Sequence, residues 1–119
     1  MTERTDIDTT VLRARLLARR DEILRLDASE ADERKTVELD PQRLGRLSRM
    51  DALQSQAMAQ ETERRRHLEV RKIDAALARL EAGEFGYCAA CGDEIPAKRL
   101  AFDPAASLCV DCAQDTAKP

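Results

Sequence analysis

The sequence predicts an all-α protein with two parts: a long antiparallel helical hairpin of coiled-coil type, and a small C-terminal domain that ends in a short closing helix. Glycine and proline are absent from residues 1–40 and again from residues 46–82, with Pro41 and Gly45 between them. Because these two residue types disfavour helix interiors most strongly, each long segment without them is expected to be helical. Residues 1–84 also lack the aromatic side chains that dominate globular cores. We therefore expect no conventional globular domain in the N-terminal part.

The first segment carries a helix start signal and an apolar stripe. Thr9 or Thr10 is a suitable N-cap. The apolar positions follow a heptad-like 4-3 rhythm with a polar interruption: Leu12, Leu16, Ile23 and Leu26. After this stripe the sequence DASEADERKTVELD is acidic and poor in apolar residues. We expect the helix to end between about residues 28 and 36.

The second segment predicts a helix from Ser48, its expected N-cap, to the glycine at position 83, which is placed to be a C′ residue. Its apolar positions are Met50, Leu53, Ala57, Leu68, Ile73, Leu77 and Leu80. Met50 and Met58 are eight positions apart, a helical spacing, and are expected to pack in the hairpin seam.

Charged residues between these apolar positions are expected to form a solvated helix face. The run ETERRRHLEVRK alternates acidic and basic residues, which is typical of i,i+4 pairs on a surface. Arg64, Arg65 and Arg66, with Arg71 and Lys72, are expected to belong to this face, and the alternative is that they contact an acidic partner surface. The only histidine, His67, lies in the same run and is interpreted as a solvated residue without a catalytic or ligand role.

The charge balance bears on the possible partners. The 20 basic and 23 acidic residues give a formal net charge of −3. This charge gives no support to a nucleic-acid or membrane-surface binder that depends on overall positive charge, so any contact with a polyanion would have to be local. The N-terminal sequence MTERTDIDTT lacks the apolar region of a signal peptide, and no apolar run approaches the ~18 residues of a membrane span. We expect a soluble, cytoplasmic protein.

Four cysteines form two C-x-x-C pairs, Cys88 with Cys91 and Cys109 with Cys112. Their separation fits the C-x₂-C-x₁₅₋₂₀-C-x₂-C pattern of a zinc site. Two such pairs supply four thiolates for one tetrahedral ion and leave no open position for water or substrate, so the zinc is expected to be structural. A thioredoxin-like redox motif, two disulfides and an iron-sulfur cluster are alternatives. The redox motif normally lies in a βαβ context, which is absent here.

The composition changes at residue 83, so the sequence divides into a helical hairpin over residues 1–83, with its tip near 40–52, and a metal-binding domain over residues 84–119. Six sparse apolar residues of the second part are expected to form a mini-core around the metal: Phe85, Tyr87, Ile95, Leu100, Phe102 and Leu108. A domain of this size is not expected to fold without its metal. Residues 110–117 predict the closing helix. Arg99 is expected to pack on Phe102, to pair with an acidic residue or to face a partner, and the sequence does not distinguish among these three roles.

The string FGYCAACGDEIPAKRLAFDPAASLCVDCA resembles the C4 zinc finger of the DksA/TraR family of bacterial transcription factors. The matching positions are Phe85-Gly86, Cys88, Cys91-Gly92, Ile95, Arg99-Leu100, Pro104, Leu108-Cys109 and Cys112. They cover about a third of the chain, and the predicted hairpin extends the resemblance in architecture.

The resemblance implies a function that the cysteines alone do not. Family members look like rods that bind RNA polymerase, insert their coiled coil into its secondary channel and alter open complexes, commonly together with the stringent-response alarmone ppGpp. It implies a non-enzymatic regulator without sequence-specific DNA contacts, and we expect a monomer. Two alternatives stay open: a zinc-finger module that binds nucleic acid, and a thiol or zinc redox-sensing regulator. No ppGpp-binding residues are assigned.

The tip of the hairpin departs from the family pattern. Well-known members carry Asp-x-x-Asp-x-Ala there, whereas this chain reads LDPQRLGRLSRMDAL. Asp40 resembles the start of the motif. A gap-free count from the cysteines instead brings Asp51 and Ala52 just beyond its last position. We expect Asp51, with Arg49 and Ala52 beside it, to be the polymerase contact, and Asp40 is the other candidate. The simpler interpretation is that Asp51 is a helix N3 residue favoured by the macrodipole.

Overall fold

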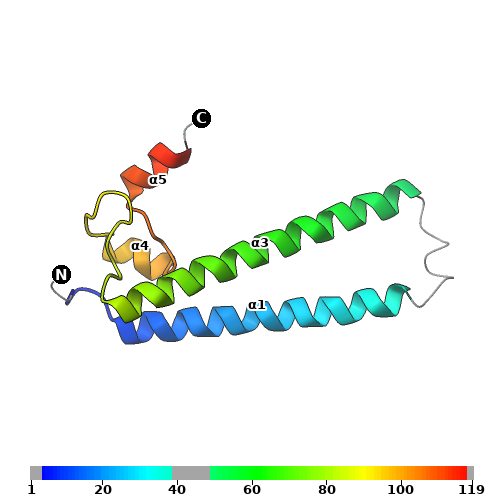
Figure 1. The fold of residues 1–119 in the computed structure, drawn as a ribbon, viewed down its shortest axis with the longest axis horizontal. Coiled ribbons are helices and arrows are strands. Elements are labelled where there is room, and N and C mark those ends of the chain that lie inside the picture. The colour runs from blue at the N-terminus through cyan, green and yellow to red at the C-terminus, as the bar shows by residue number, and fades with distance from the viewer. Residues whose placement is uncertain (1–3, 39–48, 118–119) are drawn as a thin grey trace. The chain divides into compact units, whose positions relative to one another are not determined.

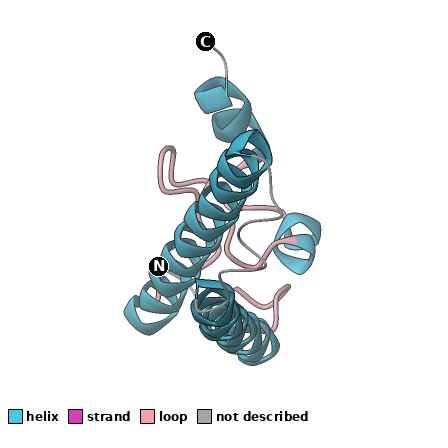
Figure 2. Ribbon diagram, turned by 90° about the vertical axis from the view of Figure 1, so that its right-hand side faces the viewer, coloured by secondary structure: helices cyan, strands magenta, loops and turns pink. Residues whose placement is uncertain are grey.

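The computed structural model describes residues 4–38 and 49–117. Within these ranges the chain forms helices and no extended strand (Figure 1): α1 (Thr9–Glu38), α3 (Arg49–Ala82), α4 (Ala97–Phe102) and α5 (Val110–Ala117). Figure 2 shows the helices joined by loops. One antiparallel bridge links Tyr87 to Glu94 among the described residues. The all-α prediction with a closing helix is confirmed, and α4 has no counterpart among the predicted elements. None of the described helices is long and apolar enough to cross a membrane.

The N-cap of helix α1 is the residue that precedes the two candidates predicted from the sequence. The Asp8 Oδ1 atom accepts the backbone N–H groups of Thr10 and Val11 at 3.1 and 3.2 Å. Asp8, and not Thr9 or Thr10, is therefore the N-cap. Aspartate and threonine are both good caps, so residue type alone does not choose between neighbours.

Helix α1 also ends later than predicted. It continues through Glu38, past the expected end between residues 28 and 36. Half of the acidic segment consists of Ala, Glu, Arg and Lys, which are good helix formers, and the segment contains neither glycine nor proline. Its poverty in apolar residues therefore does not end the helix.

Helix α3 ends at the predicted glycine. Gly83 has a φ of +73° and donates its N–H to the Leu80 carbonyl at 3.3 Å, and Glu84 donates to the Arg79 carbonyl at 2.9 Å. These two bonds are the pair that defines a Schellman motif. The prediction that Gly83 is the C′ residue is confirmed.

The chain divides into two compact units. The cysteine unit consists of Met1–Arg19 and Arg71–Pro119, and the helix-pair unit is Arg20–Val70. Each unit contains a piece of α1 and a piece of α3. The division into a hairpin over residues 1–83 and a finger over residues 84–119 stays a prediction.

The cysteine unit contains most of the buried apolar side chains. They are Leu12, Leu16, Ile73, Ala76, Phe85, Cys88, Ile95, Leu100 and Ala106. Phe102, predicted to join this mini-core, is 91% exposed. Leu100 and Phe102 are two positions apart on α4, and since each residue turns the helix by about 100°, they point in nearly opposite directions.

The helix-pair unit is held differently. Among its described residues only Ile23 is a buried hydrophobic side chain. Arg66 of α3 meets Glu30 of α1 through Nη2 and Oε1 at 2.9 Å, and His67 of α3 meets Asp27 at 3.5 Å between Nε2 and Oδ2. Residue numbers rise on one helix as they fall on the other, so the two helices run antiparallel here.

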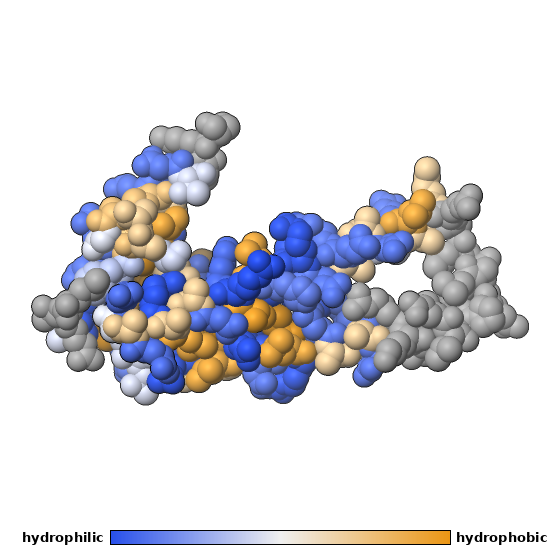
Figure 3. All heavy atoms as spheres, in the orientation of Figure 1, coloured by the Kyte–Doolittle hydropathy of each residue, from blue (hydrophilic) through white to orange (hydrophobic). Residues whose placement is uncertain are grey.

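Several predicted seam residues are exposed instead. They are Leu26, Met50, Leu53, Met58 and Leu68. Exposed apolar side chains of α1 appear as orange patches among charged neighbours in Figure 3. The solvated interpretation of Arg66 is also wrong, because this side chain is only 19% exposed and pairs across the helices. Arg64 and Arg65 do lie on the surface, where both pair with Glu61.

Candidate metal centre

The first cysteine pair lies in a tight loop that follows α3. Cys88 donates its backbone N–H to the Asp93 carbonyl at 2.7 Å, and Gly92 returns a bond to the Cys88 carbonyl at 2.9 Å. Gly92 has a φ of +79°, a conformation that favours glycine. The loop therefore turns back on itself immediately after Cys91 and brings the two thiols of the pair onto one side.

The second pair lies at the start of α5. Cys109 precedes the helix, and its Sγ accepts the backbone N–H of Cys112 at 3.5 Å, as an N-cap oxygen would. The Ala113 N–H reaches the Cys109 carbonyl at 2.9 Å. The positive end of the helix dipole favours a thiolate at this position.

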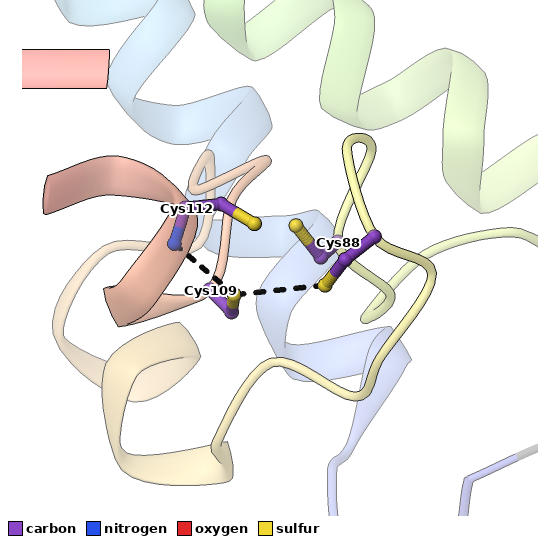
Figure 4. Close-up of side chains that lie close together, drawn as sticks. Cys88, Cys109 and Cys112 are labelled. Carbon is purple, nitrogen blue, oxygen red and sulfur yellow. Dashed lines mark hydrogen bonds between the residues drawn. The ribbon is translucent and has the colours of Figure 1, made fainter. Parts of the chain in front are cut away.

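The four predicted cysteines come together. Their Sγ atoms all lie within 4.8 Å of one another, and Figure 4 shows the sulfurs of Cys88, Cys109 and Cys112 directed toward a common space. The Sγ atoms of Cys91 and Cys109 are 3.7 Å apart. A tetrahedral zinc ion with Zn–S bonds of about 2.3 Å requires sulfurs roughly 3.8 Å apart, whereas a disulfide requires about 2.05 Å. All four cysteines are free thiols, and the spacing fits one tetrahedral zinc ion.

The electrostatics of the thiols also fit a cation. Hydrogen bonds to the Cys88 sulfur from the backbone N–H of Cys109 and then of Cys91 lower its pKa to about 6. The neighbouring thiols, Cys109 first, raise the pKa of Cys112 above its usual range. Four thiolates this close repel one another, so they do not all ionise unless a positive ion lies between them. A divalent metal removes that conflict and completes a closed site without an open position.

Other predicted site residues belong to the helix-pair unit or lie outside the described part. Asp51 and Ala52 lie in the first turn of α3 and are exposed. Arg49 is the first residue of α3, and its side chain is outside the described set. Asp40 lies outside the described residues altogether. The polymerase contact assigned to these residues remains a prediction.

Two arginines stabilise the loops around the cysteines. Arg99, for which the sequence offered three roles, donates its Nε–H to the Leu108 carbonyl at 2.9 Å, next to Cys109, and those three roles stay predictions. Arg4 was not singled out by the sequence, yet its side chain is only 3% exposed and reaches the first cysteine loop. No local pattern in MTERTDIDTT reveals that contact, since the partners are more than 80 positions away.

Comparison with known proteins gives the same assignment for this part of the chain. Residues 83–116 match the family model of the prokaryotic dksA/traR C4-type zinc finger. The RNA polymerase-binding transcription factor DksA of Haemophilus influenzae is 49% identical over 43 residues, covering 36% of this chain and 30% of that protein. The factor of the same name from Escherichia coli is 46% identical over 43 residues, covering 36% and 28%. The matched stretch thus spans less than a third of the length of these curated relatives.

The fold extends the similarity beyond the finger. The solved structure of transcription factor DksA2 from Pseudomonas aeruginosa matches with a TM-score of 0.66 and 27% identity, over 90% of this chain and 81% of that one. The four cysteines within the matched segment are arranged to hold one zinc ion. Residues 83–116 of this chain therefore form a zinc finger similar to the prokaryotic dksA/traR C4 type.

Proposed function

We propose that this protein binds RNA polymerase and regulates the initiation of transcription, without acting as an enzyme. The observation that carries the proposal is that the likeness to DksA2 extends over 90% of the chain rather than over the finger alone. Two curated relatives are named RNA polymerase-binding transcription factors. The closed cysteine site supports a regulator rather than a catalyst, because four protein ligands leave no position for substrate.

In this proposal the helical hairpin is the part of the protein that enters the polymerase. As in the family, the hairpin enters the secondary channel of the polymerase, and the start of α3 lies near the active site. Asp51 and Ala52 are exposed in the first turn of α3, which makes them available to a partner. Arg49 and Asp40 complete the proposed tip. The protein acts in the cytoplasm as a monomer, makes no sequence-specific DNA contact, and ppGpp modulates its complex with polymerase.

A crosslinking experiment tests the binding mode. A photoreactive amino acid replaces Asp51 in one variant and Lys98, an exposed residue of α4, in the control. After association with core RNA polymerase, residue 51 is expected to crosslink near the active site and residue 98 is not. Failure to associate at micromolar concentration contradicts the proposal. If the protein binds naked DNA or RNA, and this binding weakens steeply as the salt concentration rises, the nucleic-acid alternative is favoured.

A matched pair of substitutions tests the tip. Asp51→Asn is expected to bind polymerase normally but to lose regulation of a sensitive promoter, measured with and without ppGpp by transcription in vitro. Asp74→Asn, on the exposed side of the same helix, is the control and should keep both properties. If Asp51→Asn regulates like the wild type, Asp51 serves only the helix dipole, a contribution of about 0.3–1 kcal/mol to stability. Rapid oxidation of the cysteines with loss of zinc would favour the redox-sensing alternative.

A further inference from the structure

The segment before α1 contacts the finger through one arginine. Arg4 Nη1 donates to the Gly86 carbonyl at 2.7 Å and to the Ile95 carbonyl at 2.6 Å. The acceptors lie 82 and 91 positions away in the sequence. The Arg4 side chain is 3% exposed, so this is a buried contact and not a passing surface interaction.

The two acceptors flank the loop that carries the first cysteine pair. Gly86 precedes Cys88, and Ile95 follows Cys91. Ile95 donates its own N–H to the Gly86 carbonyl at 2.8 Å, and the Tyr87–Glu94 bridge joins the same two sides of the loop. The Arg4 guanidinium therefore ties together the two chain segments at the base of the metal-holding loop.

The charge of Arg4 is compensated mainly by Asp6 of its own segment, while Glu94 of the cysteine loop lies 4.0 Å from Nη2. Asp6 accepts Arg4 Nε–H at 3.0 Å and Nη2–H at 2.7 Å, a two-bond pairing that fixes the plane of the guanidinium. The hydrogen bond from Arg4 holds the pKa of Asp6 below its usual range. The three guanidinium nitrogens together donate four of their five N–H groups to defined acceptors, an arrangement that only arginine can make.

The backbone of Gly86 is shaped for this contact. Gly86 has a φ of +95°, and a Cβ atom added there would lie 3.1 Å from Arg4 Nη1 and 3.3 Å from Ile7 Cδ1. The glycine thus permits both the turn and the close approach of the N-terminal segment. The packing of Arg4 and Ile7 against Gly86 forms one continuous contact between the segment and the loop.

We propose that Arg4 and Asp6 are structural members of the zinc finger, and that the Arg4 guanidinium acts as a latch that holds the Cys88–Cys91 loop in its metal-binding geometry and slows zinc release. The finger therefore includes a segment at the other end of the chain. By linkage, a metal that orders the loop also orders the N-terminal segment. The proposal does not depend on the polymerase.

The test measures zinc transfer from the intact, zinc-loaded chain to an excess of a chromogenic chelator. Arg4→Met keeps the aliphatic stem and removes the donors, and it is expected to release zinc roughly tenfold faster or more, as is common for groups that support metal ligands. Arg13→Met is the matched control, because Arg13 lies on α1 in the same unit but is exposed, and it pairs with Glu81 at 3.3 Å. It should stay within about twofold of the wild type. Equal release rates for Arg4→Met and the wild type overturn the proposal.

Hydrogen exchange in the zinc-loaded proteins separates a local latch from general destabilisation. In Arg4→Met the amides of Ile95 and Cys88, which bond across the loop, are expected to exchange faster, while Ala113 in α5 is unchanged. Faster exchange at all three amides contradicts a local role. If Arg4→Met does not retain zinc at all, Arg4→Lys decides: an intermediate release rate supports the latch, and a wild-type rate contradicts it because lysine lacks the planar fork.

Discussion

The cysteine unit and the helix-pair unit contain pieces of the same two helices but are stabilised by different interactions. In the cysteine unit, apolar side chains from α1, α3 and the finger are buried, and the metal site and Arg4 add long-range ties. In the helix-pair unit, Ile23 is the single buried hydrophobic side chain among the described residues, and charged groups of Asp27, Glu30 and Arg66 join the helices.

The difference teaches where the molecule opens first. Partly exposed ion pairs such as those of Arg66 contribute less to stability than buried apolar area and metal binding do. Regions with few buried contacts open locally at lower free energy than the core. We therefore expect the helix-pair unit to exchange its amide protons faster than the cysteine unit while zinc is bound, and the predictions below test that contrast.

Removal of zinc should have the largest effect, and it should reverse which of the two units exchanges its amide protons faster. Structural zinc contributes about 10–16 kcal/mol of apparent binding free energy in small fingers. After chelation, or in a Cys88→Ser variant, residues 83–117 are expected to lose protection in hydrogen exchange followed by mass spectrometry. The helix-pair unit should change less. Unaltered protection of the finger after chelation would show that the metal is not needed for its fold.

Truncation of the buried leucine of α4 should come next. Leu100→Ala is expected to lower the free energy of unfolding of the cysteine unit by about 2–5 kcal/mol, because Leu100 is fully buried. Phe102→Ala, which removes a larger but exposed side chain two positions on, should change it by less than about 0.5 kcal/mol. Urea unfolding of the zinc-loaded proteins measures both. Similar losses of unfolding free energy for the two variants would mean that the Phe102 side chain is buried in solution and not exposed.

Loss of the interhelical arginine should have a smaller effect, confined to the other unit. Arg66→Met removes the partner of Asp27 and Glu30 and should speed amide exchange around residues 20–32 and 60–70. Arg65→Met, whose exposed side chain pairs with Glu61 on the same helix, is the control and should change little. The difference should shrink as salt rises, since the Debye length falls from about 10 Å at 0.1 M to about 3 Å at 1 M. A difference that is independent of salt argues against an electrostatic contact.

The smallest effect concerns acid. Hydrogen bonds from Arg64 and then Arg65 lower the pKa of Glu61 from its usual 4.5 to about 2. A lowered pKa in the folded state means that these pairs stabilise the fold fully above pH 4.5 and are lost as pH falls through about 2. The stability difference between wild type and Glu61→Gln should therefore be small and constant at neutral pH, decline below pH 4.5 and vanish below about pH 2. An NMR titration that finds the ordinary pKa for Glu61 would contradict this expected pH dependence.

Local signals were enough to predict several features of this molecule. The C-x-x-C pairs and Gly83 act within a few residues, so the sequence predicts both the cysteine cluster and the end of α3. Phe102 and Leu26 could not be assigned in the same way. Both are apolar, but burial depends on which face a partner helix covers, and at Leu26 the neighbouring contact is the charged pair of Asp27 with Arg66.

Long-range polar contacts were the least predictable. Arg4 and Arg66 each look like surface residues in sequence, and their partners are known only once distant segments are brought together. The same holds for Arg99, whose acceptor is a backbone carbonyl and therefore leaves no trace in residue type. The metal ligands could be predicted from the sequence, but not the arginines that hold their loops.

The separation between Arg4 and Ile95 also sets an order of events during synthesis. Ile95 follows Arg4 by 91 positions, which at about 5–20 residues per second takes the ribosome roughly 5 to 18 seconds. Helix α1 forms on a much shorter timescale, within microseconds. The segment around Arg4 must therefore wait, exposed, until the loop that ends at Ile95 has been made. Each newly made molecule passes through an interval in which proteases or modifying enzymes can reach this segment, and the arrival of the finger ends that interval.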